Sequence, residues 1–203
     1  ANPASGKTFI TINLAVSLAI KSKKILVIDL DLRQAALSNY IDHPRTGISN
    51  YLGGLTTEVK DIIIHSKEYP TLDIIPVGII PPNPTELLFS KRLEDLIAKL
   101  KNEYDYVFID CPPIGIVADT SIIGKWADIT LFIIRAELME RDMLPATEEL
   151  YTKKKLNNMA ILLNGTTAAY GGRYGYHYYG YRYGYNYGYG FYNYNSYEQK
   201  TKR

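Results

Sequence analysis

Short apolar segments alternate with longer segments of helical periodicity between residues 24 and 163. Runs rich in Val, Ile and Phe predict strands, and apolar positions repeated every three to four residues predict helices. The predicted strands are residues 24–29, 72–77, 106–110, 129–135 and 159–163, and the predicted helices are residues 7–21, 83–102, 120–126 and 142–156. Because each strand is nearly all apolar, we expect the strands to be covered on both faces.

This alternation is typical of βαβ units around a parallel sheet. Pro84 and Pro145 fall near the starts of predicted helices, where proline is well tolerated. We therefore predict an α/β domain over residues 1–166, with a doubly wound, mostly parallel sheet flanked by helices.

The composition changes abruptly beyond residue 166. Residues 170–197 contain 13 tyrosines, many glycines and no aliphatic side chain. Such a segment cannot build a packed core that offsets the entropy of ordering its glycines. We predict a flexible, disordered tyrosine-rich tail over residues 167–203.

Charge and cysteine content exclude several classes of protein. The chain has 23 basic and 21 acidic side chains, so its formal net charge of +2 gives no indication of a nucleic-acid partner. Cys111 is the only cysteine, which excludes an intramolecular disulfide framework and suits a reducing compartment. We find neither an apolar run of membrane-spanning length nor an export signal.

The first eight residues, ANPASGKT, fit a phosphate-binding P-loop with alanine in the first glycine position. An amphipathic helix follows directly, so loop amides and the helix N-terminus would converge on phosphate oxygens. We expect Lys7 between the β- and γ-phosphates of ATP and the Thr8 hydroxyl on Mg²⁺. The alternative is a chance GKT tripeptide. The predicted nucleotide-binding residues of the loop are Ser5, Gly6, Lys7, Thr8 and Phe9.

Aspartates follow two of the predicted strands, at the ends where open α/β sheets bind ligands. Asp29 and Asp31 end the segment ILVIDLD, and Asp110 ends YVFID. A single aspartate of this kind is often only a turn former or helix cap. Together with a P-loop, however, such carboxylates can hold Mg²⁺ or accept a proton from an attacking hydroxyl.

The ordered set of motifs resembles one family. It comprises the GKT loop, IDLDLR at residues 28–33, the GxxPPNPxELL segment at residues 78–88, IDCPP at residues 109–113, and the tyrosine cluster. These look like the bacterial tyrosine kinases, the cytoplasmic kinase domains of polysaccharide co-polymerases that control capsule and exopolysaccharide assembly. The resemblance implies an ATP- and Mg²⁺-dependent protein-tyrosine kinase with a P-loop NTPase-like fold.

The resemblance also assigns roles to matching residues. Gly6, Lys7 and Thr8 would form the Walker A motif, and Lys7, Asp29 and Asp31 would be catalytic, with Asp31 favoured over Asp29 as the base. The implied metal-site residues are Thr8, Asp29, Asp31 and Asp110. Asn164 lies where related P-loop proteins read adenine, although it can equally be a turn residue after a strand.

The tail would then be the substrate, phosphorylated in trans between neighbouring subunits, with regulation by the number of phosphates. Its candidate acceptors are Tyr170, Tyr174, Tyr176, Tyr178, Tyr179, Tyr181, Tyr183, Tyr185, Tyr187, Tyr189, Tyr192, Tyr194 and Tyr197. The alternative for the tail is an adhesive or phase-separating tract.

The resemblance implies a ring-like homo-oligomer, a membrane-anchoring co-polymerase region or activator, a tyrosine phosphatase, and a location at the inner face of the bacterial cell membrane. The family's EXXRXXR assembly helix and the strand that feeds the P-loop would lie before Ala1, so we leave oligomer formation by this chain open. Two other functions stay open: a nucleotide-switched partition or cell-division ATPase, and a scaffold with a degraded site. Asn2 stands where those ATPases carry a second, signature lysine, which favours the kinase.

Overall fold

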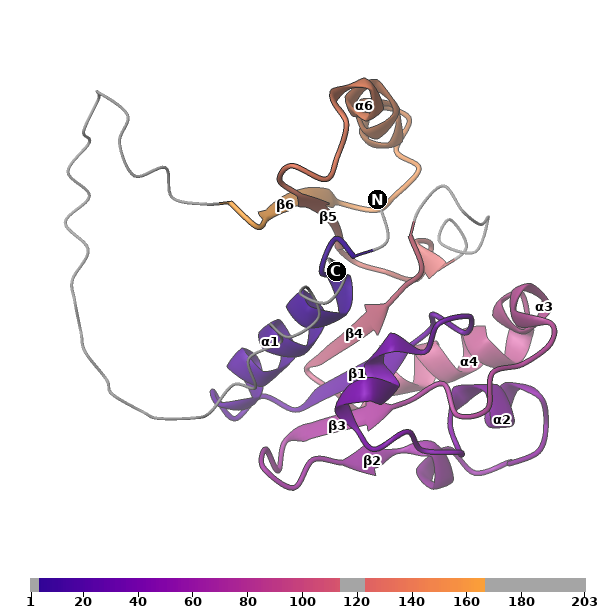
Figure 1. Cartoon of the computed structure of the whole chain (residues 1–203). Helices are drawn as coiled ribbons and strands as arrows, with labels where there is room; N and C mark the ends of the chain where they lie inside the picture. The colour runs from indigo at the N-terminus through magenta and orange to yellow at the C-terminus, as the bar shows by residue number, and fades with distance from the viewer. Residues whose placement is uncertain (1–3, 114–122, 167–203) are drawn as a thin grey trace, which may run out of the picture. The chain divides into compact units, whose positions relative to one another are not determined.

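A computed structural model describes residues 4–113 and 123–166 (Figure 1). The predicted tail, and residues 120–122 of the helix predicted at residues 120–126, fall outside these ranges. Within them, no helix has both the length and the apolar character required to cross a membrane. The helices are α1 (Lys7–Ala19), α2 (Ile48–Leu52), α3 (Pro84–Leu88), α4 (Lys91–Leu100) and α6 (Leu144–Thr152), and the 3₁₀ helices are η1 (Ala36–Tyr40), η2 (Val59–Ile62) and η3 (Arg141–Met143). The strands are β1 (Ile25–Asp29), β2 (Ile64–His65), β3 (Leu72–Ile75), β4 (Tyr106–Asp110), β5 (Thr130–Arg135) and β6 (Met159–Asn164).

The strands form two sheets. Four of them pair in the order β2-β3-β1-β4, and β5 pairs with β6. All pairs are parallel except β2 with β3, which confirms the predicted mostly parallel α/β arrangement. The sequence did not predict β2, because a strand of two residues carries no measurable alternation.

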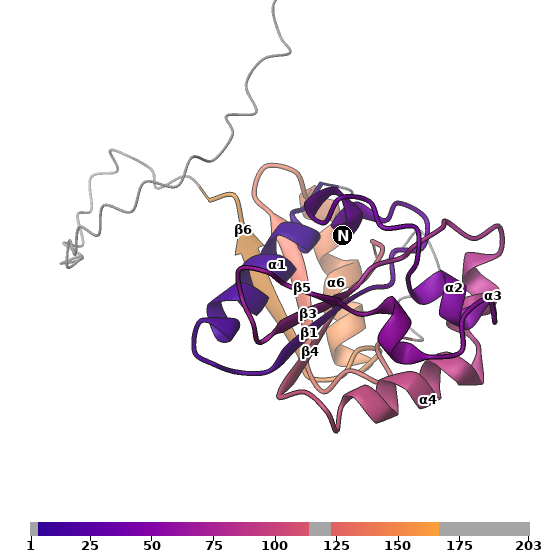
Figure 2. The ribbon, with the colours of Figure 1, turned by 90° about the horizontal axis from the view of Figure 1, so that it is seen from below.

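Helices cover both faces of the four-stranded sheet (Figures 1 and 2). Strand β1 lies between β3 and β4 and is buried throughout. Ile25 and Val27 pack with Ala15 and Ala19 of α1 on one face. The alternate residues of β1 point to the other face, because successive side chains of a strand take opposite sides.

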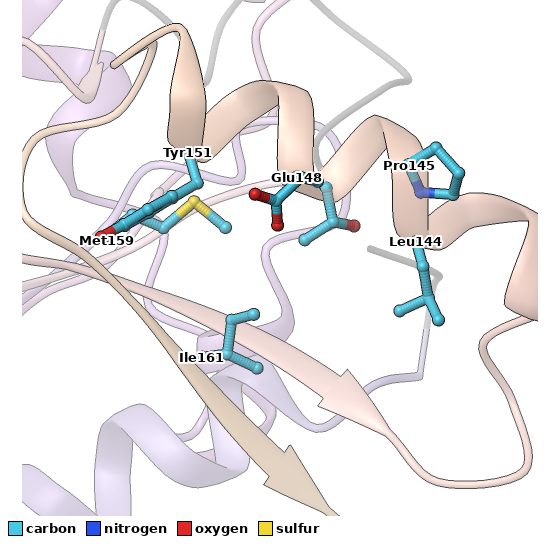
Figure 3. A pocket seen from close by; sticks show the side chains of 7 residues that line it. Leu144, Pro145, Glu148, Tyr151, Met159 and Ile161 are labelled. Carbon is cyan, nitrogen blue, oxygen red and sulfur yellow. The ribbon is translucent and has the colours of Figure 1, made fainter.

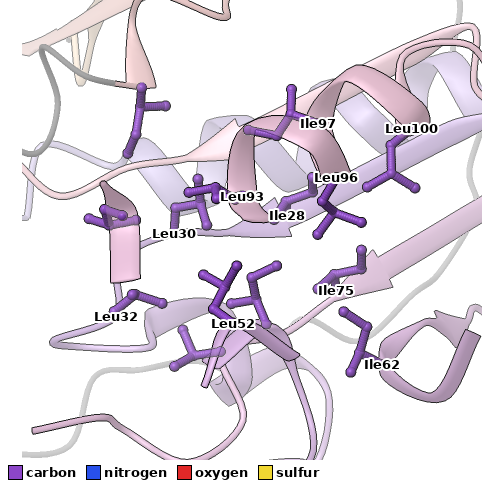
Figure 4. Packing of buried hydrophobic residues seen from close by; sticks show 14 of the residues in the cluster. Ile28, Leu30, Leu32, Leu52, Ile62, Ile75, Leu93, Leu96, Ile97 and Leu100 are labelled. Atoms are coloured by element: carbon purple, nitrogen blue, oxygen red, sulfur yellow. The ribbon is translucent and has the colours of Figure 1, made fainter. Parts of the chain in front are cut away.

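The larger core lies on that second face, between β1, α2 and α4 (Figure 4). Leu26 and Ile28 of β1 belong to it. The buried residues of α4 follow helical spacing: Leu93, Leu96, Ile97 and Leu100. These two layers fix β1 from both sides, and with it the carboxyl end that carries Asp29.

The expected coverage on both faces holds for β1 and is wrong for the outer strands. Tyr106 of β4, Leu131 of β5, and Ile161 and Leu163 of β6 are all exposed large side chains. An apolar run in the sequence shows that a strand can be buried, whereas its actual burial depends on which elements pack beside it.

The helix predicted at residues 83–102 is instead two helices, α3 and α4, separated by Phe89 and Ser90. The Ser90 hydroxyl donates to the Leu87 carbonyl over 2.7 Å and accepts the Leu93 N–H over 3.3 Å, so it ends one helix and caps the next. Phe89 is 61% exposed, so it does not pack with the buried leucines of α4.

The helix predicted at residues 142–156 is also shorter. It begins as η3, continues as α6 with Pro145 in its first turn, and ends at Thr152. Lys154 has a positive φ of 49°, which an α-helix cannot contain. The basic run at residues 153–155 therefore follows the helix rather than forming one of its faces.

Ser90→Ala should destabilise the fold by about 1 kcal/mol, because it removes the cap of the helix that covers β1. Urea unfolding would measure this as a lower midpoint with an unchanged slope. The matched control is Ser17→Ala, which removes an exposed hydroxyl bonded to the Asn13 carbonyl inside α1. Equal midpoints for the two variants would contradict the capping role.

Candidate phosphate-binding site

The carboxyl ends of β1 and β4 bring two of the predicted aspartates together. The parallel register pairs Asp29 with Asp110 as direct neighbours. Asp29 is 0% exposed, Asp110 2% and Asp31 6%. Three acidic side chains from two strand ends thus lie in a region that excludes most water.

The P-loop leads into α1 with unusual backbone geometry. Gly6 is the N-cap, with φ of 90°, and the first helical hydrogen bond runs from the Ile10 N–H to the Gly6 carbonyl over 2.9 Å. The N–H groups of residues 7–9 precede that bond and have no carbonyl one turn back. The Ser5 hydroxyl is buried and has no hydrogen-bond partner in the described part of the chain. Donors of both kinds suit an anionic ligand.

The loop and the acidic strand ends form one cluster. The Thr8 hydroxyl donates to Asp110 Oδ2 over 2.6 Å, although the two residues are 102 positions apart. The positive charge of Lys7 acts on Asp110 and opposes the rise in its pKa. The structure therefore brings together the predicted residues of the loop and of β4.

Burial makes ionisation of these carboxyls costly. The pKa of Asp29 is raised from 3.8 to about 7, chiefly by burial and then by the charge of Asp110. Burial also raises the pKa of Asp110, against the opposing effects of the Thr8 hydrogen bond and of Lys7. The cluster carries more negative charge than its own basic groups compensate, which favours a bound cation.

The aspartates also shape the chain locally, as the turn-former alternative anticipated. Asp29 Oδ1 accepts the Asp31 N–H over 3.0 Å, and Asp29 Oδ2 accepts the Leu37 N–H over 3.3 Å. Asp31 Oδ1 accepts the Gln34 N–H over 3.2 Å. Both carboxylate oxygens of Asp29 are thus engaged by backbone, whereas Asp31 has one such bond.

The donor set fits Mg²⁺ without forming a ready-made protein cage. No three His, Cys, Asp or Glu side chains among the described residues are grouped closely enough to hold a metal by themselves. Mg²⁺ characteristically takes one or two protein oxygens and completes its shell with water and substrate phosphates. The adjacent oxygens of Thr8 and Asp110 supply such a pair.

Asn164 contacts the P-loop from the carboxyl end of β6. Its Nδ2 donates to the Ser5 carbonyl over 3.0 Å. Arg135, at the end of β5, donates from Nη1 to the Ala4 carbonyl over 3.0 Å. Arg135 was not predicted from the sequence, because its partner is a backbone carbonyl. The predicted Phe9 is 52% exposed.

Comparisons with known proteins identify the family. A family described as AAA domain matches residues 4–139. The tyrosine-protein kinase CpsD of Streptococcus agalactiae is 35% identical over 177 residues, which are 84% of this chain and 76% of that protein. The chain belongs to the bacterial tyrosine kinase family.

Other bacterial tyrosine kinases are similar to this chain in sequence and in fold. The kinase domain of the Escherichia coli tyrosine kinase ETK superposes with a TM-score of 0.75 at 32% identity, covering 87% of this chain and 69% of that one. A putative tyrosine-protein kinase in the cps region of Klebsiella pneumoniae is 35% identical over 86% of this chain but only 24% of its own length. The chain thus spans about a quarter of that longer relative. The predicted P-loop NTPase-like fold is confirmed.

Two further features of the chain take no part in the binding of phosphate or metal. An apolar groove between α6 and β6 is lined by residues such as Tyr151, Met159 and Ile161, and it contains no predicted site residue (Figure 3). Cys111 directly follows Asp110, and burial together with neighbouring carboxylates raises the pKa of its thiol. A raised thiol pKa disfavours the reactive thiolate, in agreement with a packing residue at a strand end.

The raised pKa of Asp29 predicts that the metal-free protein loses stability as pH rises. The pKa of this carboxyl is about 7 in the folded state and 3.8 in the unfolded state. Between these two pH values, the folded state therefore binds more protons than the unfolded state. The contribution of this carboxyl to the free energy of unfolding is fully present below pH 3.8, and it is lost as pH rises through about 7. The slope is at most about 1.4 kcal/mol per pH unit.

Urea unfolding of metal-free protein between pH 5.5 and 8 measures that slope. Asp29→Asn should flatten it, whatever its effect on absolute stability, because the titrating group is removed. The matched control Asp142→Asn changes an exposed carboxyl and should leave the slope in place. An unchanged slope in Asp29→Asn would show that another group titrates.

Proposed function

We propose that this chain is the ATP-binding core, residues 1–166, and substrate tail, residues 167–203, of a protein-tyrosine kinase that phosphorylates its own tyrosine cluster in trans. The observation that carries the proposal is the hydrogen bond between Thr8 and Asp110. It joins the phosphate-binding loop to the acidic strand ends, and both are required for phosphoryl transfer. Family membership and the tyrosine-rich composition of residues 170–197 support it.

The residues of the cluster have distinct roles in this proposal. Loop amides and Lys7 bind the β- and γ-phosphates of ATP and orient the γ-phosphoryl group. Mg²⁺, held through Thr8 and Asp110 and through water from the other carboxylates, would neutralise charge on the phosphates. The tyrosine oxygen forms a bond to the γ-phosphorus, the bond to the ADP oxygen breaks, and the tyrosine proton passes to a carboxylate.

Asp31 is the better candidate for that carboxylate. Asp29 is fully buried and both of its oxygens accept backbone N–H groups. Asp31 keeps a small exposed area and has a single backbone bond, so an oxygen remains for an entering hydroxyl. Tyrosine has a pKa of about 10, so it needs such a base near neutral pH.

The tail and the cellular context complete the proposal. About 30 residues of the tail reach roughly 100 Å when extended, which is enough for many tyrosines to enter a neighbour's site. Successive phosphates would then weaken contacts between subunits. We place the kinase at the inner face of the bacterial membrane, with a co-polymerase or activator region and a phosphatase as partners in capsule and exopolysaccharide production.

Lys7→Met should reduce phosphotyrosine formation by about 100-fold or more, because the β/γ-phosphates lose their cationic ligand. Purified protein would be incubated with ATP and Mg²⁺, and its phosphotyrosines mapped by mass spectrometry. We expect labelling within residues 170–197 of the wild-type chain. ATP hydrolysis without any phosphotyrosine there would instead favour a nucleotide-switched ATPase.

Asp31→Asn should lower the rate of tyrosine phosphorylation by about 100-fold, since it removes the base, and change ATP affinity by only a few-fold. The rate and the affinity would be measured separately, by single-turnover labelling and by calorimetry. Asp142→Asn, at an exposed position, serves as the control. A normal rate in Asp31→Asn with a lost rate in Asp29→Asn would assign the base to Asp29.

A further inference from the structure

Side chains at the carboxyl ends of β5 and β6 donate hydrogen bonds to two successive carbonyl groups of the P-loop. Arg135 and Asn164 are direct neighbours in the parallel register of these strands. Arg135 Nη1 donates to the Ala4 carbonyl and Asn164 Nδ2 to the Ser5 carbonyl, each over 3.0 Å. We propose that Arg135 and Asn164 form a clamp that holds the P-loop in its phosphate-binding conformation.

The loop requires such support because its backbone is strained. Ala4 has φ of 65° although it carries a Cβ. Residues with a Cβ seldom adopt a left-handed conformation unless their surroundings hold them there. When the carbonyls of Ala4 and Ser5 are fixed toward the strand ends, the following amides stay directed at the phosphates.

Two glycines make room for the clamp. A Cβ on Gly6 would overlap Asn164 Nδ2, and a Cβ on Gly165 would lie 3.3 Å from Arg135 Cγ. The Asn164 amide is also oriented from both ends, because its Oδ1 accepts the Gly165 N–H over 2.8 Å. An amide with a donor on one side and an acceptor on the other cannot flip without losing both bonds.

The clamp gives Asn164 a role other than reading adenine. A base-reading residue affects only ligands that carry the base, whereas a residue that positions the loop affects every ligand that uses the loop amides. The inference rests on the phosphate site of the proposed function. It extends that function to Arg135 and to the strand ends of the second sheet.

Calorimetric titration with three ligands in Mg²⁺ separates these roles: inorganic tripolyphosphate, ATP, and inosine triphosphate, whose base differs at the purine 6-position. Arg135→Ala and Asn164→Ala should each weaken binding of all three by a common factor of about tenfold, equivalent to about 1.4 kcal/mol. The ratio between ATP and inosine triphosphate should stay at the wild-type value.

Control variants remove similar bonds elsewhere. Arg92→Ala loses a guanidinium bond to the Thr56 carbonyl at 2.9 Å, and Asn157→Ala loses an amide bond to the Ala127 carbonyl at 3.1 Å. Both should bind tripolyphosphate as the wild type does, even where thermal unfolding shows lower stability. Arg135→Lys keeps the charge, but the lysine ammonium ends one bond short of the position of Arg135 Nη1, so we expect its affinity near that of Arg135→Ala.

Several outcomes would overturn the clamp. Wild-type affinity in Arg135→Lys would show that Arg135 acts only through its charge. A changed preference for ATP over inosine triphosphate in Asn164→Ala, with normal tripolyphosphate binding, would show that Asn164 recognises adenine. Equal effects of clamp and control variants would show general destabilisation. If the alanine variants do not fold, Arg135→Lys and Asn164→Ser carry the same comparison. If the wild type binds none of the three ligands, the proposed function is overturned as well.

Discussion

The register between β1 and β4 is the constraint on which the site depends. It places Asp29 next to Asp110 at the carboxyl edge of a sheet. Burial raises the pKa of both carboxyls, and the negative charge of Asp110 raises that of Asp29 further. The fold tolerates this arrangement because Thr8 and Lys7 at the start of α1 offset part of it. A divalent cation would offset the negative charge that remains.

Packing on both faces of β1 enforces that register. Ile25 and Val27 contact α1, and Leu26 and Ile28 contact the α4 layer. A shift of one residue would send each set to the opposite face and expose the complementary surfaces of both helices. The core therefore does more than stabilise the domain. It fixes the acidic strand end relative to the helix that carries the phosphate-binding loop.

Sequence reasoning reached the parts of the site that depend on local rules. Strand-end aspartates were predictable because the carboxyl ends of parallel strands meet at one edge. The break at Ser90 was missed because a helical pattern continues through it, and the cap becomes visible only when Ser90 is seen to bond Leu87 and Leu93. Arg135 was missed for a different reason. Its partner is a backbone carbonyl, which has no signature in the sequence.

The loop and the carboxylates of the cluster can serve two nucleophiles: water, which would hydrolyse ATP, and a tyrosine hydroxyl, which would be phosphorylated. The composition of the tail favours tyrosine, and it also supplies a reason for turnover to stop. With a formal net charge of +2, the chain becomes anionic after two phosphates, each worth about −1.5 to −2 charges. A phosphorylated segment would then be repelled by an acidic site that burial leaves poorly screened. Under the proposed function, each transfer would make the product a weaker ligand than the tyrosine that it replaced, which would favour exchange of one tyrosine for the next.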